Sequence, residues 1–115
     1  MTPDQFRRLA LSQPQAVEGS HMNHADFRVG KRIFATLGYP DADWAMVKLS
    51  PDQQRALVAA QPRVFVPANG AWGQRGSTLA KLDRLDDRTA ADALRMASRN
   101  VAPVPPGSRP RARPR

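Results

Sequence analysis

The sequence predicts an α+β domain: an antiparallel β-sheet meander with helices packed on one face. Three observations predict it. Two similar helix-start patterns, Thr2-Pro-Asp-Gln5 and Ser50-Pro-Asp-Gln53, stand on either side of a segment rich in strand-forming residues. Short turns separate the apolar runs of that segment, and strands joined by short turns pair antiparallel because parallel neighbours need long crossovers. Helices and strands that are segregated along the chain indicate the α+β class.

The chain divides into a predicted domain over residues 1–101 and a tail over residues 102–115. A length of 115 residues with 41% hydrophobic residues suits one globular core. The tail is rich in proline and arginine, a composition that cannot build a core, and we expect it to be disordered.

The first element is a short helix that starts at the Thr2-Pro-Asp-Gln5 pattern. Thr2 is the N-cap, Gln5 reaches back to it, and the proline stands at the first helical position, where its missing N–H costs little. Phe6, Leu9 and Ala10 follow at helical spacing and form one apolar face. The helix should end near Gln13-Pro14 because the residue before a proline avoids the α region.

The strands come next. An edge strand is expected to begin at 16–18, and Phe27 and Val29 alternate with charged residues as in a half-buried strand. Gly30-Lys31 is a two-residue turn, with glycine supplying a positive φ. Residues 33–37 and 44–49 are the following strands, joined by a loop over 38–43.

The register of these strands decides which side chains face the helices. The turn pairs Val29 with Arg32, and the loop pairs Leu37 with Trp44. The further pairs counted from them are Phe27 with Phe34, Ala35 with Met46, and Ile33 with Lys48. The predicted core face carries Phe27, Val29, Phe34, Val47 and Leu49. The predicted open face carries Arg28, Ile33, Ala35, Leu37, Trp44, Met46 and Lys48. A three-residue turn would exchange the two faces of the first strand.

The second half of the chain is expected to form two more capped helices with two strands between them. A helix from Ser50 should run to about Ala60, followed by a strand at 64–66, a glycine-rich loop over 68–76 that holds Trp72, and a strand at 78–82. Asp86 is the N-cap of a last helix that ends near Asn100, with Leu85 as a staple. Its apolar face includes Ala90, Leu94 and Ala97.

Charge and composition bound the function. The net charge is +8, and half of it comes from four arginines in residues 104–115. Such a balance favours polyanionic partners. The absence of cysteine excludes disulfides, thiolate metal sites and cysteine nucleophiles. Because no secretory signal and no membrane-spanning run are visible, we expect a monomeric, cytoplasmic protein with no membrane partner.

The motifs taken together resemble the MmcQ/YjbR family. They are the run Glu18-Gly-Ser-His-Met-Asn-His-Ala-Asp-Phe-Arg-Val-Gly-Lys-Arg-Ile-Phe-Ala-Thr36, the run Met46-Val-Lys-Leu-Ser50, and the Trp72 loop followed by Thr78. The resemblance covers everything but the tail. It implies a CyaY-like (frataxin-like) fold and a double-wing DNA-binding role, and it implies no catalytic residue. Family members often carry a basic residue after the Asn of an Asn-x-x-Trp element. Asn69-Gly-Ala-Trp72 lacks it, and Arg75 could substitute.

Other chemistries find less support in the sequence. Glu18, His21, His24 and Asp26 could form a metal cluster, but their spacing fits no zincin pattern, and residues 21 and 24 of one strand point to opposite faces. Ser20 beside His21 lacks a nucleophile elbow. The glycine spacing around Trp72 matches no phosphate-binding motif. We therefore expect no catalytic residue, no metal and no cofactor.

The leading hypothesis is a non-enzymatic domain that binds DNA through a basic hairpin and the Trp72 loop. Basic side chains beside an exposed aromatic ring suit phosphate contact and base stacking. The candidate site residues are Arg28, Lys31, Arg32, Lys48, Trp72 and Arg75.

Two alternatives stay open. A protein- or ligand-interaction module would use an apolar open face and requires exposed side chains at Ile33, Leu37, Trp44 and Met46. An enzyme with a histidine-carboxylate site would require the two histidine side chains to lie within about 5 Å of each other.

Overall fold

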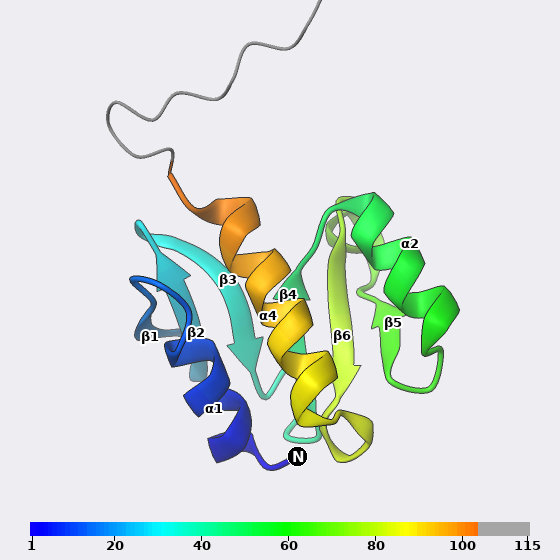
Figure 1. Cartoon of the computed structure of the whole chain (residues 1–115), viewed down its shortest axis with the longest axis horizontal. Helices are drawn as coiled ribbons and strands as arrows, with labels where there is room; N and C mark the ends of the chain where they lie inside the picture. Colours follow the sequence, from blue (N-terminus) through cyan, green and yellow to red (C-terminus); the bar gives the residue numbers. More distant parts are fainter. Residues whose placement is uncertain (104–115) are drawn as a thin grey trace, which may run out of the picture.

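The structure, a computed structural model, describes residues 1–103 as one antiparallel sheet covered by helices (Figure 1). In chain order the elements are α1 (Pro3–Leu11), β1 (Val17–His21), β2 (His24–Val29), β3 (Arg32–Leu37), β4 (Trp44–Lys48), α2 (Pro51–Ala60), β5 (Phe65–Pro67), α3 (Gly70–Gln74), β6 (Ser77–Lys81), a 3₁₀ turn (Leu82–Arg84) and α4 (Asp87–Val101). The predicted α+β class and the order of the predicted elements are confirmed, with α3 added. The predicted disordered tail falls, from residue 104 onward, outside the described residues.

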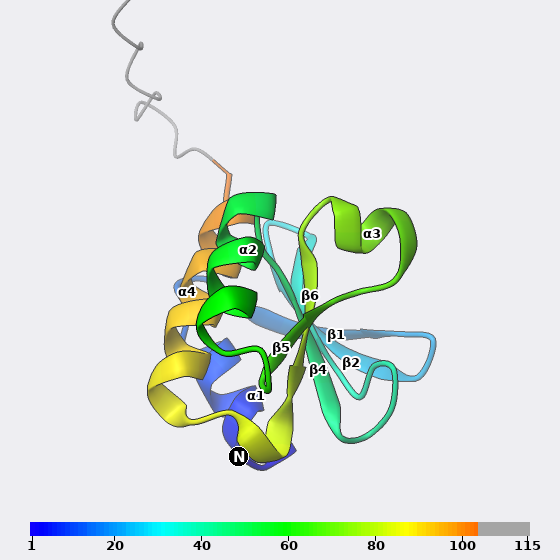
Figure 2. The same ribbon diagram turned by 90° about the vertical axis from the view of Figure 1, so that its right-hand side faces the viewer.

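The sheet has six strands in the order β1-β2-β3-β4-β6-β5, and every neighbouring pair is antiparallel. The first four strands form the predicted meander. Helices α1, α2 and α4 cover one face, with α4 packed against β2, β3 and β4. Turning the molecule shows these three helices on one side of the sheet and α3 on the other (Figure 2). The three predicted helices therefore share one face as predicted, and α3, a segment predicted as a loop, lies on the other.

Helix ends follow the predicted capping chemistry. The side chains of Thr2 and Ser50 each accept a hydrogen bond from the backbone N–H three residues later. The side-chain oxygens of Gln5 and Gln53 each accept one from the backbone N–H of the capping residue. Asp86 accepts a 2.7 Å bond from the backbone N–H of Thr89, a bond that lowers the pKa of this carboxyl. Each capping interaction depends on residues within one turn, so the local sequence is enough to place it.

The β2–β3 hairpin carries a β-bulge that the sequence reading missed. The predicted turn is confirmed, since Val29 pairs with Arg32. Arg28 then pairs with Ile33 but Phe27 pairs with Ala35, not with Phe34 as predicted. Phe34 is thus the extra residue of the bulge, and both it and Ala35 are fully buried in the core. The bulge shifts the rest of β3 by one residue and so exchanges its faces.

The β3–β4 loop shifts the next register as well. Leu37 pairs with Ala45, one residue beyond the predicted partner Trp44. The reason is an extra turn in the loop, where the carbonyl of Asp41 accepts from the backbone N–H of Trp44 at 3.1 Å. Ala35 accordingly pairs with Val47 instead of Met46, and no pair between Ile33 and Lys48 forms.

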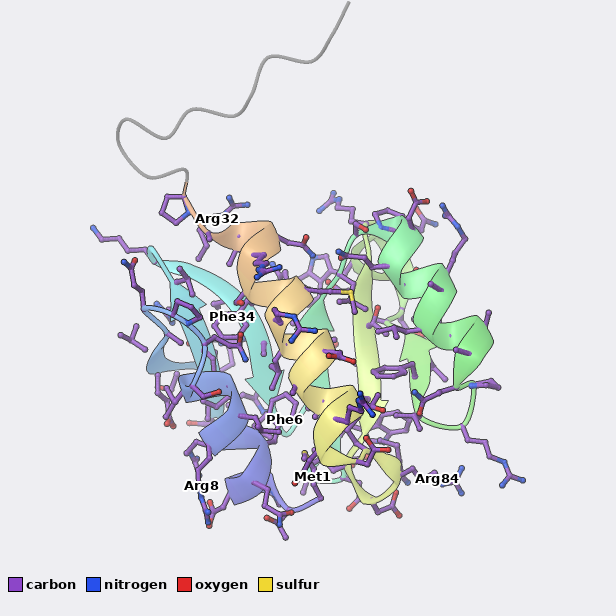
Figure 3. All side chains as sticks on the ribbon, in the orientation of Figure 1. Met1, Phe6, Arg8, Arg32, Phe34 and Arg84 are labelled. Atoms are coloured by element: carbon purple, nitrogen blue, oxygen red, sulfur yellow. The ribbon has the colours of Figure 1, made fainter. Side chains whose placement is uncertain are left out.

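These shifts correct the predicted faces. All five residues assigned to the core face, Phe27, Val29, Phe34, Val47 and Leu49, are buried in the core as predicted. Ala35 and Leu37, assigned to the open face, belong to the core instead. Phe6 of α1 and Phe34 of β3, both labelled in Figure 3, belong to this buried core. Within residues 1–103 no helix is long and apolar enough to cross a membrane.

Candidate binding pocket on the open face

The open face is the side of the sheet that α1, α2 and α4 leave uncovered. Alternation along the strands places the side chains of Arg28, Ile33, Thr36, Met46 and Lys48 on it. Trp44 shares this face and is half-buried, with Lys81 Nζ 5.3 Å from its ring centroid. Of the four side chains required for an exposed apolar interaction patch, Leu37 lies in the core and Met46 is only 8% exposed. That patch is therefore not present as predicted.

A buried carboxylate organises one side of this face. The Asp26 side chain is inaccessible to solvent, and both of its carboxylate oxygens take part in hydrogen bonds. Arg28 donates from Nε to Oδ1 at 2.7 Å and from Nη2 to Oδ2 at 3.0 Å, while Nδ1 of His21 lies 2.7 Å from Oδ2. The hydrogen bond from Arg28 lowers the pKa of Asp26 below its ordinary 3.8. Burial raises this pKa in part, and the hydrogen bond with His21 lowers it further. Asp26 is therefore ionised near neutral pH.

The ionised Asp26 fixes the orientation of His21. A carboxylate only accepts hydrogen bonds, so Nδ1 of His21 must carry a hydrogen and donate it to the hydrogen bond with Asp26. Nε2 of the ring is then an acceptor in the neutral form, and within the described residues it has no partner. Gly19 leaves room for this cluster, because a Cβ there would lie 3.0 Å from both Arg28 Nε and Asp26 Oδ1.

The two histidines lie on the same face, contrary to the prediction. His21 pairs directly with His24 across a two-residue turn, Met22-Asn23, in which both φ angles are positive. The ring centroids are 6.4 Å apart and the rings meet edge to face, so the two histidines are neighbours. No three His, Asp or Glu side chains of residues 1–103 are grouped so that they could hold a metal ion.

The Trp72 segment is a short helix, not the predicted loop. Helix α3 is held by Gln54 of α2, whose side-chain nitrogen donates to the carbonyls of Gly73 at 2.9 Å and Ser77 at 3.0 Å. Gly73 is required for this packing, because a Cβ there would lie 1.7 Å from the carbonyl oxygen of Ala68. Anchored in this way, α3 holds Trp72 with 56% of its surface exposed.

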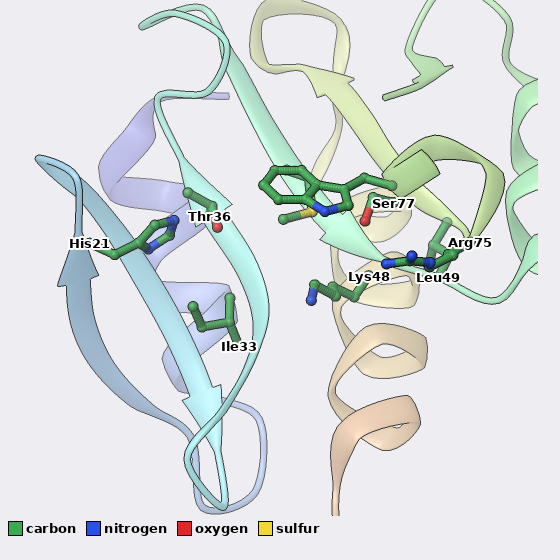
Figure 4. A pocket seen from close by; sticks show the side chains of 9 residues that line it. His21, Ile33, Thr36, Lys48, Leu49, Arg75 and Ser77 are labelled. Carbon is green, nitrogen blue, oxygen red and sulfur yellow. The ribbon is translucent and has the colours of Figure 1, made fainter. Parts of the chain in front are cut away.

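A pocket of about 360 Å³ lies on the open face between the β1–β3 strands and α3 (Figure 4). Three of its lining residues, Lys48, Trp72 and Arg75, are among the six predicted site residues. The other lining residues are His21, Ile33, Thr36, Met46, Leu49 and Ser77. Figure 4 shows His21, Ile33 and Thr36 on one side of the hollow and Lys48, Ser77 and Arg75 on the other.

The remaining three predicted residues do not line the pocket. Arg28 is engaged by Asp26, and this bond raises the pKa of its guanidinium. Lys31 and Arg32 are exposed at the β2–β3 turn. Arg32 begins β3 and Lys48 ends β4, and because these strands are antiparallel both residues lie at the same end of the sheet.

One lining residue has an unsatisfied polar group. Thr36 is 2% exposed, and its Oγ1 has no hydrogen-bond partner. The backbone places it opposite Asp26 on one side and Met46 on the other. In Figure 4 its hydroxyl oxygen points into the hollow. A buried hydroxyl without a partner is unusual in a folded protein and calls for an explanation at this site.

Comparison with known proteins identifies the chain. The family model YjbR matches residues 11–100, most of the sequence. The chain belongs to the YjbR family. The resemblance inferred from its motifs is thereby confirmed, and no match was found among curated proteins.

Solved structures share the YjbR fold seen here. A Deinococcus radiodurans protein with a DUF419 domain is 19% identical, with a TM-score of 0.69 over 84% of this chain and 75% of its own. A Pseudomonas syringae protein is 14% identical, with a TM-score of 0.64 over 88% of this chain and 99% of its own. At such identities the likeness extends to the fold alone.

The YjbR pocket contains residues that the sequence reading did not select. Thr36 was missed because its face depends on the bulge at Phe34, which has no sequence signal of its own. Strand parity argues against His21, but it does not hold here because residues 21 and 24 stand on either side of a hairpin turn. The Asn at position 23 was an available hint, since asparagine tolerates positive φ better than most residues.

Proposed function

We propose that this YjbR domain binds single-stranded DNA on its open face, in a binding and not a catalytic role. The observation that carries the proposal is Trp72, which is 56% exposed and lines the same pocket as two cations, Lys48 and Arg75. An exposed indole offers a stacking surface for an unpaired base, and neighbouring cations offer contacts to the backbone phosphates.

The charges of this region are free to act on a ligand. Neither Lys48 nor Arg75 takes part in any of the ion pairs formed within residues 1–103, and no acidic residue lines the pocket. Lys31 and Arg32 extend the basic region along the same end of the sheet. A strand whose bases reach Trp72 would thus keep its phosphates near Lys48 and Arg75 at the pocket and near Lys31 and Arg32 further along the same end of the sheet.

Single-stranded DNA fits this surface better than duplex DNA. The indole and the hollow beside it can only be reached by a base that is unpaired and turned away from its neighbours. The sequence prediction of a basic hairpin as the main contact is modified here, because Arg28 is neutralised by Asp26.

Fluorescence anisotropy with a labelled single-stranded oligonucleotide tests the proposal. We expect a dissociation constant on the order of 10 µM at ~150 mM salt, as for weak non-specific binders. A full-length variant with Arg109, Arg111, Arg113 and Arg115 replaced by serine separates the tail from the folded domain. Binding that survives these substitutions supports the proposal. The absence of binding at this salt concentration, or its complete loss in the serine variant, overturns it.

A further inference from the structure

The pocket beside Trp72 has the size and the lining of a ligand site. Its volume of about 360 Å³ falls in the range of pockets that bind small molecules, roughly 300–1,000 Å³. Ile33, Met46 and Leu49 supply an apolar wall, and Trp72 supplies an aromatic one. Such a lining suits a flat, largely apolar group and is poorly suited to an inorganic anion alone.

Uncharged hydrogen-bonding groups lie on one side of the pocket and positive charges on the other. On the side of β1 and β3, Thr36 Oγ1 has no partner and His21 has a free ring nitrogen, while Asp26 prevents the histidine ring from turning. On the side of β4 and α3 stand the two cations, Lys48 and Arg75. A ligand that satisfies both sides must carry hydrogen-bonding groups at one end and negative charge at the other.

We propose that the pocket binds one nucleotide unit. Its base lies against Trp72 and the apolar wall, with its polar edge toward Thr36 and His21, and its phosphate lies between Lys48 and Arg75. The base supplies a flat ring with donors and acceptors on its edge, and the phosphate supplies the charge. If the nucleotide is one unit of a DNA strand, this inference rests on the proposed function. A free nucleoside monophosphate carries the same base and phosphate and could occupy the same pocket.

The Thr36→Val variant isolates the polar end of the pocket. Valine has nearly the shape of threonine and removes only a hydroxyl that is unpaired in the free protein, so the fold should be retained. If the hydroxyl bonds the base, the variant should bind about fivefold more weakly, as expected for one neutral hydrogen bond. Arg84→Gln, an exposed residue of the 3₁₀ turn after β6, is the matched control and should bind like the wild type.

Calorimetric titrations of the full chain compare 2′-deoxyadenosine 5′-monophosphate, 2′-deoxyadenosine, inorganic phosphate and an oligodeoxyadenylate of about 12 nucleotides. Monophosphate binding that is stronger than that of the nucleoside or of phosphate, and that weakens in Thr36→Val, supports a site for a free nucleotide. Oligonucleotide binding alone, weakened in the same variant, supports a site for one unit of a strand.

Two further results separate this inference from the proposed function. If the oligonucleotide binds equally well to Thr36→Val and the monophosphate does not bind, the nucleotide pocket is refuted while strand binding stands. If the monophosphate binds in a Thr36-dependent way and the oligonucleotide does not bind, strand binding is refuted while the pocket stands. If no probe binds, both are overturned.

Discussion

The Asp26 carboxylate, shut off from solvent, lies 2.7 Å from Nδ1 of His21 and holds that ring at the rim of the open-face pocket. The same carboxylate is bonded twice by Arg28. A single buried charge therefore orients a pocket residue and neutralises a cation that the sequence alone assigns to DNA. Both effects depend on Asp26 staying ionised.

The stability of the domain should depend on pH through Asp26. Its folded-state pKa lies below the ordinary 3.8, so folding favours the ionised form. The resulting stabilisation is complete above pH ~3.8 and is lost as the pH falls through the lower folded value. Asp26→Asn should lower the free energy of unfolding by about 2 kcal/mol at pH 7, because hydrogen bonds to a charged group are lost.

Urea denaturation at pH 7, 4 and 3 measures this effect. The difference in unfolding free energy between the wild type and Asp26→Asn should become smaller as the pH falls. The control is Asp52→Asn, whose carboxylate is 88% exposed in an ion pair on the surface of α2 and which should change stability little. A wild-type and an Asp26→Asn protein that lose stability in parallel would show that Asp26 is not the responsible group.

A side chain at position 19 should disturb the hydrogen-bonded cluster of His21, Asp26 and Arg28. A Cβ at Gly19 would lie 3.0 Å from Asp26 Oδ1 and Arg28 Nε, so one of the two must move. We expect Gly19→Ala to cost about 1 kcal/mol of unfolding free energy at pH 7. In the Asp26→Asn background the cost should be smaller, since the neutral amide can shift. Equal costs in both backgrounds would refute the coupling.

Helix α3 should depend on Gly73. Gly73→Ala places a methyl group 1.7 Å from the Ala68 carbonyl oxygen, and the backbone must move to relieve it. We expect a loss of about 3 kcal/mol in unfolding free energy and a change in Trp72 fluorescence. Gly70→Ala is the matched control: its Cβ would meet nothing, and its φ of +70° alone should cost about 1 kcal/mol. Equal effects of the two substitutions would contradict the packing argument.

Local chemistry made much of the fold predictable. The N-caps at Thr2, Ser50 and Asp86 depend on neighbours within one turn, so the sequence places three helices correctly. The strand register could not be predicted because it depends on the bulge at Phe34 and on the turn closed by Asp41, which are decided by packing across the sheet. Helix α3 was missed since its anchor, Gln54, lies far along the chain.

The candidate site was predictable to the extent that it depends on residue type. A tryptophan among cations suggested Lys48, Trp72 and Arg75, and these three line one pocket. The polar side of the pocket, with His21 and Thr36, depends on the register and on a hairpin turn. Residue type alone also could not show that Arg28 is neutralised, because Asp26 reaches it only in the folded sheet.

Arg75 should contribute to DNA binding through a phosphate. Arg75→Gln should weaken binding of a single-stranded oligonucleotide and reduce the slope of log K against log salt by about 0.7, the value for one lost phosphate contact. Arg84→Gln removes the same charge elsewhere on the surface; Arg84 and Arg32 lie at opposite ends of the molecule in Figure 3. An equal change of slope in both variants would mean that only net charge matters.

The most direct test of the open-face site uses the two tryptophans, which are the only ones in the chain. Trp72 is exposed at the pocket, whereas Trp44 is half-buried beside Lys81. In ¹H–¹⁵N NMR spectra of the full chain, titration with a single-stranded oligonucleotide should shift the indole N–H signal of Trp72 and leave that of Trp44 nearly unchanged. An oligonucleotide that binds while the Trp72 signal stays in place would contradict the site.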